Sequence, residues 1–312
     1  MSNPKKIRIG SRGSPLALRQ VEMVKAALGS EVETETVIIK TSGDWNPEGG
    51  EAALPESGRG KALFAKEIEE ALLQGKIDCA VHSMKDMDST LPEGLVIPCM
   101  LPREDARDAL ISRDGKGLDD LPENAIVGTT SPRRKAFLLA RRPDLKIVPF
   151  RGNVGTRLEK LKAGQVDATL LAVAGLKRLG LADRITEILD PEDMIPAAGQ
   201  GAIGIELMAK NKQLISKFSQ INCLKTIICV SSERSFIGQI GGSCHTPVGA
   251  HAVWSDGVLS LSVKLAGPGG SQFWTDSIRE NIALSEDGIE QAIRAGKTLG
   301  KKFKSMLPEG VI

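Results

Sequence analysis

Two short segments place hydroxyl and guanidinium side chains where we expect helices to begin. The first, IRIGSRGSPLALRQ, carries Arg12 and Ser14, and the second, AIVGTTSPRRKAFLLARR, carries Ser131, Arg133 and Arg134. In both, a strand-like run ends at glycine and a Ser-Pro pair follows, which is typical of an N-cap with proline in the first turn. Free N–H groups and the helix dipole favour anions there. The segments predict two anion sites, although ordinary capped helices would show the same pattern.

More cations and one aromatic residue lie in loops. The turn RGNVGTR contains Arg151 and Arg157, and a guanidinium binds a carboxylate through two parallel hydrogen bonds. Lys61 ends a long Gly/Pro/Glu-rich segment that we predict to be a loop over a cleft, and Phe64 follows it. Phe64 is predicted to pack in the core or to stack on a bound ring. Solvated side chains are the alternative for the three cations.

Lys85 and Asp86 directly follow the strand-like run KIDCAV. The carboxyl ends of strands are where α/β proteins commonly bind ligands, so we predict a functional acid at this position. Nearby cations are expected to keep an aspartate ionised, which suits it to stabilise a developing cation or to relay a proton. A solvated loop acid is the alternative. His82, on the strand itself, is predicted to be a packed structural histidine.

Cys244 differs from the other cysteines because it lies in a glycine-rich turn, GGSCHTPVG, beside His245. An exposed, reactive or modified thiol is predicted there. The others lie in apolar runs and are predicted to be core residues: Cys79, Cys99, Cys223 and Cys229. Five cysteines without a CxxC pair argue against a disulfide framework, and three histidines argue against a multi-histidine metal site. We therefore expect no metal and a reducing, cytoplasmic location.

The elements that must position these residues form two kinds of unit. Up to about residue 218, strand-like and helical runs alternate, which predicts α/β layers. Two α/β lobes that present strand ends to each other form a ligand cleft. Beyond residue 218 we predict a small α+β domain with a helix from Leu224 to Gln239, a hairpin turn at Asp256 and Gly257, and a last helix at about 286–303.

The composition excludes several classes of function. The 312 residues contain 41 Lys and Arg against 39 Asp and Glu, and a net charge of +2 gives no general attraction to nucleic acid or to an anionic membrane. Aromatic residues make up 3% of the chain, too few for a platform that stacks nucleobases. The sequence shows no apolar leader, no run of 18 apolar residues and no coiled-coil heptads. We predict no nucleic-acid, membrane or obligate protein partner, and a monomer.

Together these motifs resemble the hydroxymethylbilane synthase family, also called porphobilinogen deaminase. Eight blocks carry the resemblance in order along nearly the whole chain: RIGSRGSPLAL, GRGKALFAKEIE, AVHSMKD, VGTTSPRR, FRGNVGTRL, LAVAGLKRLG, PAAGQGAIGIE and GGSCHTPVGA. The resemblance implies two α/β domains like those of periplasmic-type binding proteins, plus a small C-terminal α+β domain. The expected boundaries are 1–99 with 200–217 for domain 1, 100–199 for domain 2 and 218–312 for domain 3.

The resemblance also implies an activity. A transferase of this family condenses four porphobilinogen molecules head-to-tail with loss of ammonia, then releases linear hydroxymethylbilane by hydrolysis, in porphyrin and heme biosynthesis. It implies a dipyrromethane cofactor joined to Cys244 by a thioether. Asp86 is then expected to be the catalytic aspartate, which contacts pyrrole N–H groups, assists loss of the amine and stabilises the azafulvene cation.

The growing product is a polyanion, because porphobilinogen carries acetate and propionate groups. The resemblance implies that the cofactor is bound by six residues: Lys85, Thr129, Ser131, Arg133, Arg134 and Arg157. It implies that the substrate is bound by six others: Arg12, Ser14, Lys61, Phe64, Arg151 and Gln200.

One departure and two alternatives accompany this interpretation. After Lys85 and Asp86 the family usually has an aliphatic residue and then proline, whereas this chain has Met87 and Asp88, and Asp88 is expected to alter the rigidity of the loop. A cytosolic carboxylate-binding or sensor protein with the same two-lobed cleft is one alternative, but it leaves Cys244 and Asp86 without a purpose. A hydrolase using Cys244 and its neighbouring histidine is the other, but it lacks an orienting partner.

Overall fold

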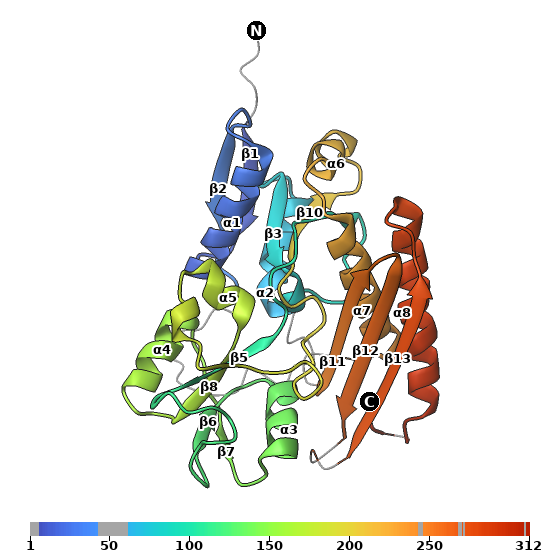
Figure 1. Cartoon of the computed structure of the whole chain (residues 1–312). Coiled ribbons are helices and arrows are strands. Elements are labelled where there is room, and N and C mark those ends of the chain that lie inside the picture. The colour runs from blue at the N-terminus through green and yellow to red at the C-terminus, as the bar shows by residue number, and fades with distance from the viewer. Residues whose placement is uncertain (1–5, 43–61, 243–245, 268–269, 271, 309) are drawn as a thin grey trace.

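Two mixed five-stranded sheets and one antiparallel three-stranded sheet organise the chain (Figure 1). The structure is a computed structural model that describes residues 6–42, 62–242, 246–267, 270, 272–308 and 310–312. In Figure 1 the first sheet lies at the top, the second at the lower left and the third at the right. The predicted fold class, two α/β lobes with a smaller α+β unit, is confirmed.

The first sheet has the strand order β2-β1-β3-β10-β4. Strands β1, β2 and β3 run parallel, whereas β10 lies antiparallel between β3 and β4. Apolar residues of α1 and α6 pack on one face and those of α2 on the other, so the strands are apolar on both sides. The elements are β1 (Ile7–Ser11), α1 (Pro15–Leu28), β2 (Thr34–Ile38), α2 (Ala62–Leu73), β3 (Cys79–Ser83), the 3-10 turn η2 (Met84–Asp86), β4 (Leu95–Met100), β10 (Ile203–Met208) and α6 (Lys212–Ser219).

The second sheet repeats this pairing pattern in the order β7-β6-β8-β5-β9. Strand β6 pairs in parallel with β7 and β8, and β5 is the antiparallel strand, between β8 and β9. The sequence patterns did not predict the antiparallel strands β5 and β10. The elements are β5 (Asp108–Ser112), β6 (Ile126–Gly128), α3 (Pro132–Arg141), β7 (Lys146–Val148), α4 (Val154–Lys162), β8 (Ala168–Ala172), α5 (Val173–Arg178), η3 (Ala182–Arg184) and β9 (Glu187–Ile188).

Two segments cross between the lobes and lie side by side. The segment after β4 meets the segment before β10 through hydrogen bonds from Glu104 N to Gly201 O and from Leu101 N to Ile203 O, both 3.1 Å long. Gly201 has a φ of +87°, and a Cβ there would lie 2.3 Å from the carbonyl oxygen of Glu104. Only glycine fits this close approach, which explains the glycine-rich sequence of the second crossing.

The C-terminal unit packs two helices on an antiparallel sheet. Its elements are α7 (Leu224–Ile240), β11 (Val248–Ser255), β12 (Val258–Ala266), β13 (Phe273–Asn281) and α8 (Glu286–Ser305). The predicted hairpin is confirmed, because Asp256 and Gly257 both have positive φ and join β11 to β12. Both predicted helices are confirmed to within two residues. Strand β13 was not predicted, since most of its residues are partly or fully exposed.

Helix α7 lies against both the C-terminal sheet and the first lobe. Its buried residues include Ile227 and Val230, which pack on Met84 and Met100 of the first lobe, and Phe236, which packs in the C-terminal core. The ring of Phe236 meets that of Phe303 of α8 edge-on, with centroids 5.4 Å apart. The helix ends at Gly241, which adopts the left-handed conformation usual for such a position. Helix α7 therefore connects the C-terminal unit to the first lobe.

Candidate functional site

Both predicted helix starts are confirmed. Ser14 precedes α1, and its Oγ accepts a hydrogen bond from Ala17 N at 3.2 Å. Ser131 precedes α3, and its Oγ accepts a hydrogen bond from Arg134 N at 3.4 Å. The two helices follow β1 and β6, which occupy the same place in the two strand orders. The repeated sequence motif thus corresponds to a repeated structural position, one in each lobe.

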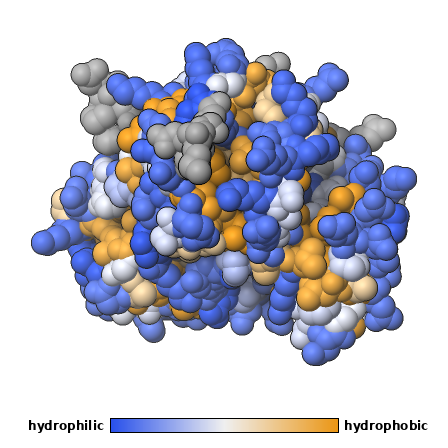
Figure 2. Space-filling model, turned by 90° about the horizontal axis from the view of Figure 1, so that it is seen from above, coloured by the Kyte–Doolittle hydropathy of each residue, from blue (hydrophilic) through white to orange (hydrophobic). Residues whose placement is uncertain are grey.

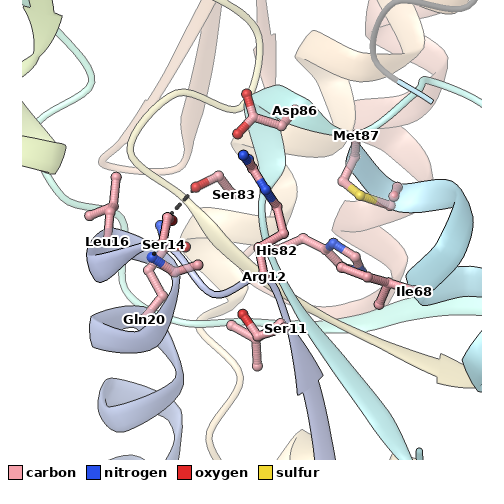
Figure 3. Close-up of a pocket in the computed structure, with 13 residues that line it drawn as sticks. Ser11, Arg12, Ser14, Leu16, Gln20, Ile68, His82, Ser83, Asp86 and Met87 are labelled. Atoms are coloured by element: carbon pink, nitrogen blue, oxygen red, sulfur yellow. Dashed lines mark hydrogen bonds between the residues drawn. The ribbon is translucent and has the colours of Figure 1, made fainter. Parts of the chain in front are cut away.

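Asp86 lies at the end of η2, directly after β3, and lines a pocket in the first lobe (Figure 3). In Figure 3 the side chain of Arg12 extends toward the carboxylate of Asp86. Gln20 donates a hydrogen bond to Ser83 Oγ at 2.7 Å across the pocket. Ser11 is buried in the pocket wall, and its Oγ has no hydrogen-bond partner among the described residues. The pocket therefore presents an acid and a cation to a small polar ligand.

Lys85 extends the site toward the second lobe. Burial lowers the pKa of Lys85 to about 8, against the opposing effect of Asp86. Arg134 and Arg133 lower this pKa further, and Asp108 raises it, so Lys85 lies within electrostatic reach of three charged residues of the second lobe. Lys85 thus links the Asp86 turn electrostatically to the charged cluster of the second lobe.

Asp108 is the charged residue that sequence reasoning missed. It begins β5 with no exposed surface, and its Oδ2 accepts from Arg133 Nη2 at 2.7 Å while its Oδ1 accepts from Arg134 Nη2 at 2.6 Å. Burial acts to raise the pKa of Asp108, but Arg133 and Arg134 outweigh burial and hold it well below its usual range. The available signal was a lone acid at the head of the apolar run DALIS, which requires a cationic partner once it is buried.

Gln200 contacts Asp108 of this cluster, whereas Thr129 accepts a hydrogen bond in the turn before α3. Gln200 is 1% exposed, and its Nε2 donates to Ala106 O at 2.6 Å and to Asp108 Oδ1 at 3.1 Å. Thr129 is buried, and its Oγ1 accepts from Ser131 N at 3.1 Å. Gln200 is thus connected to Arg133 and Arg134 through Asp108.

The remaining predicted residues fall in three groups. Arg151 and Arg157 are half-buried around the start of α4, where Arg157 Nε donates to Gly152 O at 2.9 Å and Lys160 Nζ donates to Arg151 O at 3.2 Å. The side chain of Phe64, on α2, lies outside the described part of the structure. Lys61, Cys244 and His245 also lie outside the described residues.

The histidine and cysteine predictions are mostly confirmed. His82 is buried, as predicted, and its Nε2 lies 3.0 Å from Oε2 of the fully buried Glu206 on β10. Cys79, Cys99 and Cys229 are buried, as predicted.

The prediction for Cys223 is wrong. Cys223 is partly exposed, because it lies just before the first residue of α7 rather than inside an element.

The described residues contain neither a metal-ligand group nor a membrane-spanning helix. There, no three His, Cys, Asp or Glu side chains are grouped as a metal ion would require. None of the helices in the described part of the chain is both long and apolar enough to cross a membrane.

Comparison with known proteins gives full-length similarity to one family. The family model for "Porphobilinogen deaminase, dipyromethane cofactor binding domain" matches residues 7–216, and that for "Porphobilinogen deaminase, C-terminal domain" matches residues 227–305. The chloroplastic porphobilinogen deaminase of Oryza sativa subsp. japonica is 45% identical, over 97% of this chain and 85% of that protein. The porphobilinogen deaminase of Chromobacterium violaceum is 46% identical, over 96% of this chain and 94% of that protein.

Solved structures show a weaker similarity. The VFT2 domain of Bordetella pertussis BvgS, as a double mutant, is 16% identical with a TM-score of 0.42, covering 69% of this chain and 85% of that one. A putative methionine-binding lipoprotein of Bacillus subtilis is 13% identical with a TM-score of 0.45, covering 70% of this chain and 90% of that one. The fold assignment rests on the strand orders of the two lobes rather than on these scores.

Proposed function

Because the chain belongs to the porphobilinogen deaminase family, we propose that Asp86 and the cations around it perform the chemistry of that family. The activity is that of a transferase: four porphobilinogen molecules are condensed head-to-tail with loss of ammonia, and linear hydroxymethylbilane is released by hydrolysis for tetrapyrrole biosynthesis. A sensor protein and a Cys/His hydrolase, the two alternatives raised from the sequence, do not account for this full-length similarity.

One observation carries the proposed role of Asp86: it is the only acid among the described residues that line its pocket, and it lies at a strand end with Arg12 directed at it. Pyrrole N–H groups are donors, and the Asp86 carboxylate is placed to accept from them. When the amine leaves the substrate, positive charge spreads over the pyrrole ring, and a fixed carboxylate stabilises that charge where it develops. Arg12 and Ser14, at the pocket wall, are proposed to bind the carboxylates of the substrate.

The residues of the second lobe fit a polyanionic cofactor. Lys85, Arg133 and Arg134 bring three positive charges together, against the two acids Asp86 and Asp108. Among hydrogen bonds within the described residues, Arg133 uses two of its side-chain N–H groups and Arg134 uses three. A guanidinium has five such donors, so both have N–H groups left for a carboxylate.

We infer that dipyrromethane is bound by Lys85, Arg133 and Arg134 with Thr129, Ser131 and Arg157, and that Cys244 is its point of attachment. When bound, the cofactor supplies the pyrrole carbon to which the first substrate unit is added. The protein's own residues hold its carboxylates, and those carboxylates in turn favour the protonated form of Lys85.

Arg151, Lys61 and Phe64 are proposed to bind substrate as the chain grows. Gln200 is also proposed as a substrate-site residue, and its hydrogen bond to Asp108 Oδ1 supports a role in fixing the carboxylate to which Arg133 and Arg134 are paired. These roles follow from the position of each residue in the family's sequence blocks.

We also propose that the protein is a cytoplasmic monomer. The large apolar side chains that are exposed, such as Ile38, Ile188 and Val253, come from separate elements, and Figure 2 shows apolar residues interrupted by hydrophilic ones on one face. The four described cysteines are free, which suits a reducing compartment. Sedimentation of the purified protein tests the monomer.

The proposed role of Asp86 is tested with Asp86→Ala. Turnover of porphobilinogen is expected to fall below detection, because the charge that develops on the ring loses its fixed counter-charge, while the intact mass still exceeds the sequence mass by two pyrrole units. Asp114→Ala, which removes an exposed acid paired with Lys116, is the control and keeps full activity. An unchanged rate in Asp86→Ala would refute the role.

A further inference from the structure

We propose that Arg234, on α7, is a positioning residue that fixes the turn carrying Asp86. The inference rests on the proposed function, since it concerns the residue that holds the proposed catalytic acid. From the sequence, no residue of the C-terminal unit was predicted to act on this turn. The role of Arg234 follows only from the contacts between α7 and the first lobe.

Arg234 binds the chain immediately after Asp86. Its Nη1 donates to Met87 O at 3.2 Å, and its Nη2 donates to Asp88 O. Two consecutive carbonyl groups therefore share one guanidinium, whose planar fork of donors holds both in a fixed relation. Asp86 precedes the first of these carbonyls by one residue. A shift of this segment moves the acid directly.

The other end of the turn is held from the first lobe. Met84 N donates to Ala202 O at 3.0 Å, in the crossing segment before β10, and Met87 N donates to Met84 O at 3.3 Å. The side chains of Met84 and Met87 are both buried. Lys85 and Asp86 thus lie between one anchor on the first lobe and one on α7.

The segment directly after the turn makes few other contacts among the described residues. Asp88, Ser89 and Thr90 are exposed, and Asp88 N donates no hydrogen bond within the described residues. Gly238, one turn after Arg234 on α7, lies close enough that an added Cβ would be 3.5 Å from the side chain of Ser89. Helix α7 is therefore the element against which this segment rests, and Arg234 is its polar contact.

Arg234 keeps its charge in this position. Burial lowers the pKa of Arg234 to about 10, while Asp88 and the buried Glu206 act to raise it. The guanidinium is therefore protonated at neutral pH and can donate to both carbonyls. A lysine would bring the charge but not the paired donors.

The same helix leads to the proposed cofactor attachment. Helix α7 ends at Ile240, and Cys244 follows four residues later. The contact between α7 and the Asp86 turn fixes the acid relative to this helix. Correct placement matters because misplacement of reacting groups by about 1 Å lowers a rate by on the order of 100-fold.

The test compares Arg234→Met with Arg234→Lys and with Lys225→Met in cofactor-loaded enzyme. Methionine keeps much of the apolar stem but removes both hydrogen bonds, so kcat is expected to fall about tenfold with KM changed less than about twofold. Arg234→Lys is expected to recover part of kcat. Lys225 is an exposed cation of the same helix, lies over Trp254 and serves as the matched control with unchanged kcat. An unchanged kcat in Arg234→Met overturns the proposal.

Asp88→Pro separates positioning from a loss of stability. Met87 has φ −90° and ψ 138°, the conformation that a residue before proline prefers, and proline at position 88 removes no hydrogen bond within the described residues. Proline stiffens the segment that Arg234 also holds. In the Asp88→Pro background, Arg234→Met is therefore expected to lower kcat only about threefold. A general loss of stability would not make the effect of one substitution depend on the other in this way. Equal losses in both backgrounds overturn the proposal.

Asp86→Ala, assayed beside these variants, keeps the two proposals apart. If Asp86→Ala is inactive while Arg234→Met has full kcat, only the role of Arg234 fails. If Asp86→Ala retains turnover, the proposed function of Asp86 fails first. Intact mass confirms cofactor loading in each variant, and circular dichroism confirms folding. If Arg234→Met does not fold, the kcat of Arg234→Lys is compared with that of Lys225→Met. A lower kcat in Arg234→Lys supports the positioning role of Arg234, and equal kcat values overturn it.

Discussion

The pKa of Lys85 is influenced by Asp86, the acid of its own turn, and by the guanidinium pair of the other lobe. Its lowered pKa results first from burial, and Arg134 and Arg133 add to the effect. Asp86 and Asp108 act in the opposite direction, and the carboxylate of a bound ligand would add to their effect. A bound carboxylate favours the protonated form of Lys85, so the protonation state of this residue indicates whether a carboxylate is bound.

In Cys244→Ser protein, where no cofactor occupies Lys85, the binding of porphobilinogen in the cofactor site is expected to depend on pH through Lys85. The protonated amine is the form that binds a carboxylate, so affinity is fullest below a pH of about 8 and falls as pH rises through that value, by up to about tenfold per pH unit. Equilibrium binding to Cys244→Ser protein, which cannot attach a cofactor, measures this at about pH 7 and about pH 9.

Lys85→Arg is the control for this measurement. Arginine stays charged over the whole range, so the fall in affinity between the two pH values is expected to disappear. The same fall in Lys85→Arg would assign the dependence to another group and contradict the prediction.

At the scale of elements, β5 and α3 are joined by a buried ion triad. Asp108 begins β5, whereas Arg133 and Arg134 lie in the first turn of α3, and all three are nearly or fully buried. Arg133 also donates to Ile195 O at 2.5 Å and Arg134 to Leu170 O at 2.9 Å. One carboxylate therefore fixes the first turn of α3, and breaking this group leaves two buried cations without a counter-charge.

Asp108→Asn is expected to lower the free energy of unfolding by about 3–5 kcal/mol, because removing one partner of a buried ion pair exposes the full cost of desolvating the other. Urea unfolding measures the loss. The exposed Asp114, just after the same strand, is the control, with a change for Asp114→Asn within about 0.5 kcal/mol. A loss of the same small size in Asp108→Asn would contradict the structural role.

The pH dependence of this stabilisation follows from the lowered pKa of Asp108. A carboxyl group whose folded pKa lies below its unfolded value stabilises the fold above the unfolded pKa. That contribution is lost only as pH falls through the folded value. The difference between Asp108→Asn and the parent protein is therefore expected to be constant from about pH 5 to about pH 8.

At the scale of the whole molecule, cations of the two lobes act on one another electrostatically although the net charge of the chain is +2. Arg12 and Lys85 come from the first lobe, and Arg133 and Arg134 come from the second. Their mutual repulsion opposes close approach of the lobes, and a polycarboxylate bound between them offsets that repulsion. Helix α7 adds the third unit, which contacts the first lobe through Arg234.

Cofactor loading is therefore expected to raise the midpoint of thermal unfolding. The cofactor stays attached to the chain after unfolding, but its carboxylates meet Lys85, Arg133 and Arg134 only in the folded state, so loaded protein is expected to unfold about 5 °C above Cys244→Ser protein. Calorimetry of both forms measures the difference. Cys223→Ser, at a partly exposed thiol, is the control and keeps both its mass addition and its midpoint. Equal midpoints for loaded and Cys244→Ser protein would contradict the proposed electrostatic role.

Local rules allowed much of the fold to be predicted from the sequence by itself. Helix starts at Ser14 and Ser131 and the turn at Asp256 and Gly257 depend on a few adjacent residues, so their signals are complete within short segments. The position of Asp86 after β3 is of the same kind. The balance of cations and acids also determined that any ligand must be recognised by a local site rather than by overall charge.

Only the tertiary structure decided which charged side chains contact their ion-pair and hydrogen-bond partners. Asp108 and Arg134 are 26 residues apart, and Arg234 is 147 residues from the carbonyl of Met87 that it binds. Such pairs depend on the order of strands in a sheet and on the packing of α7, and no local pattern encodes either. The partial exposure of Cys223 has the same origin. Residue types determined the chemistry available to this protein, whereas long-range packing determined which of those groups act together.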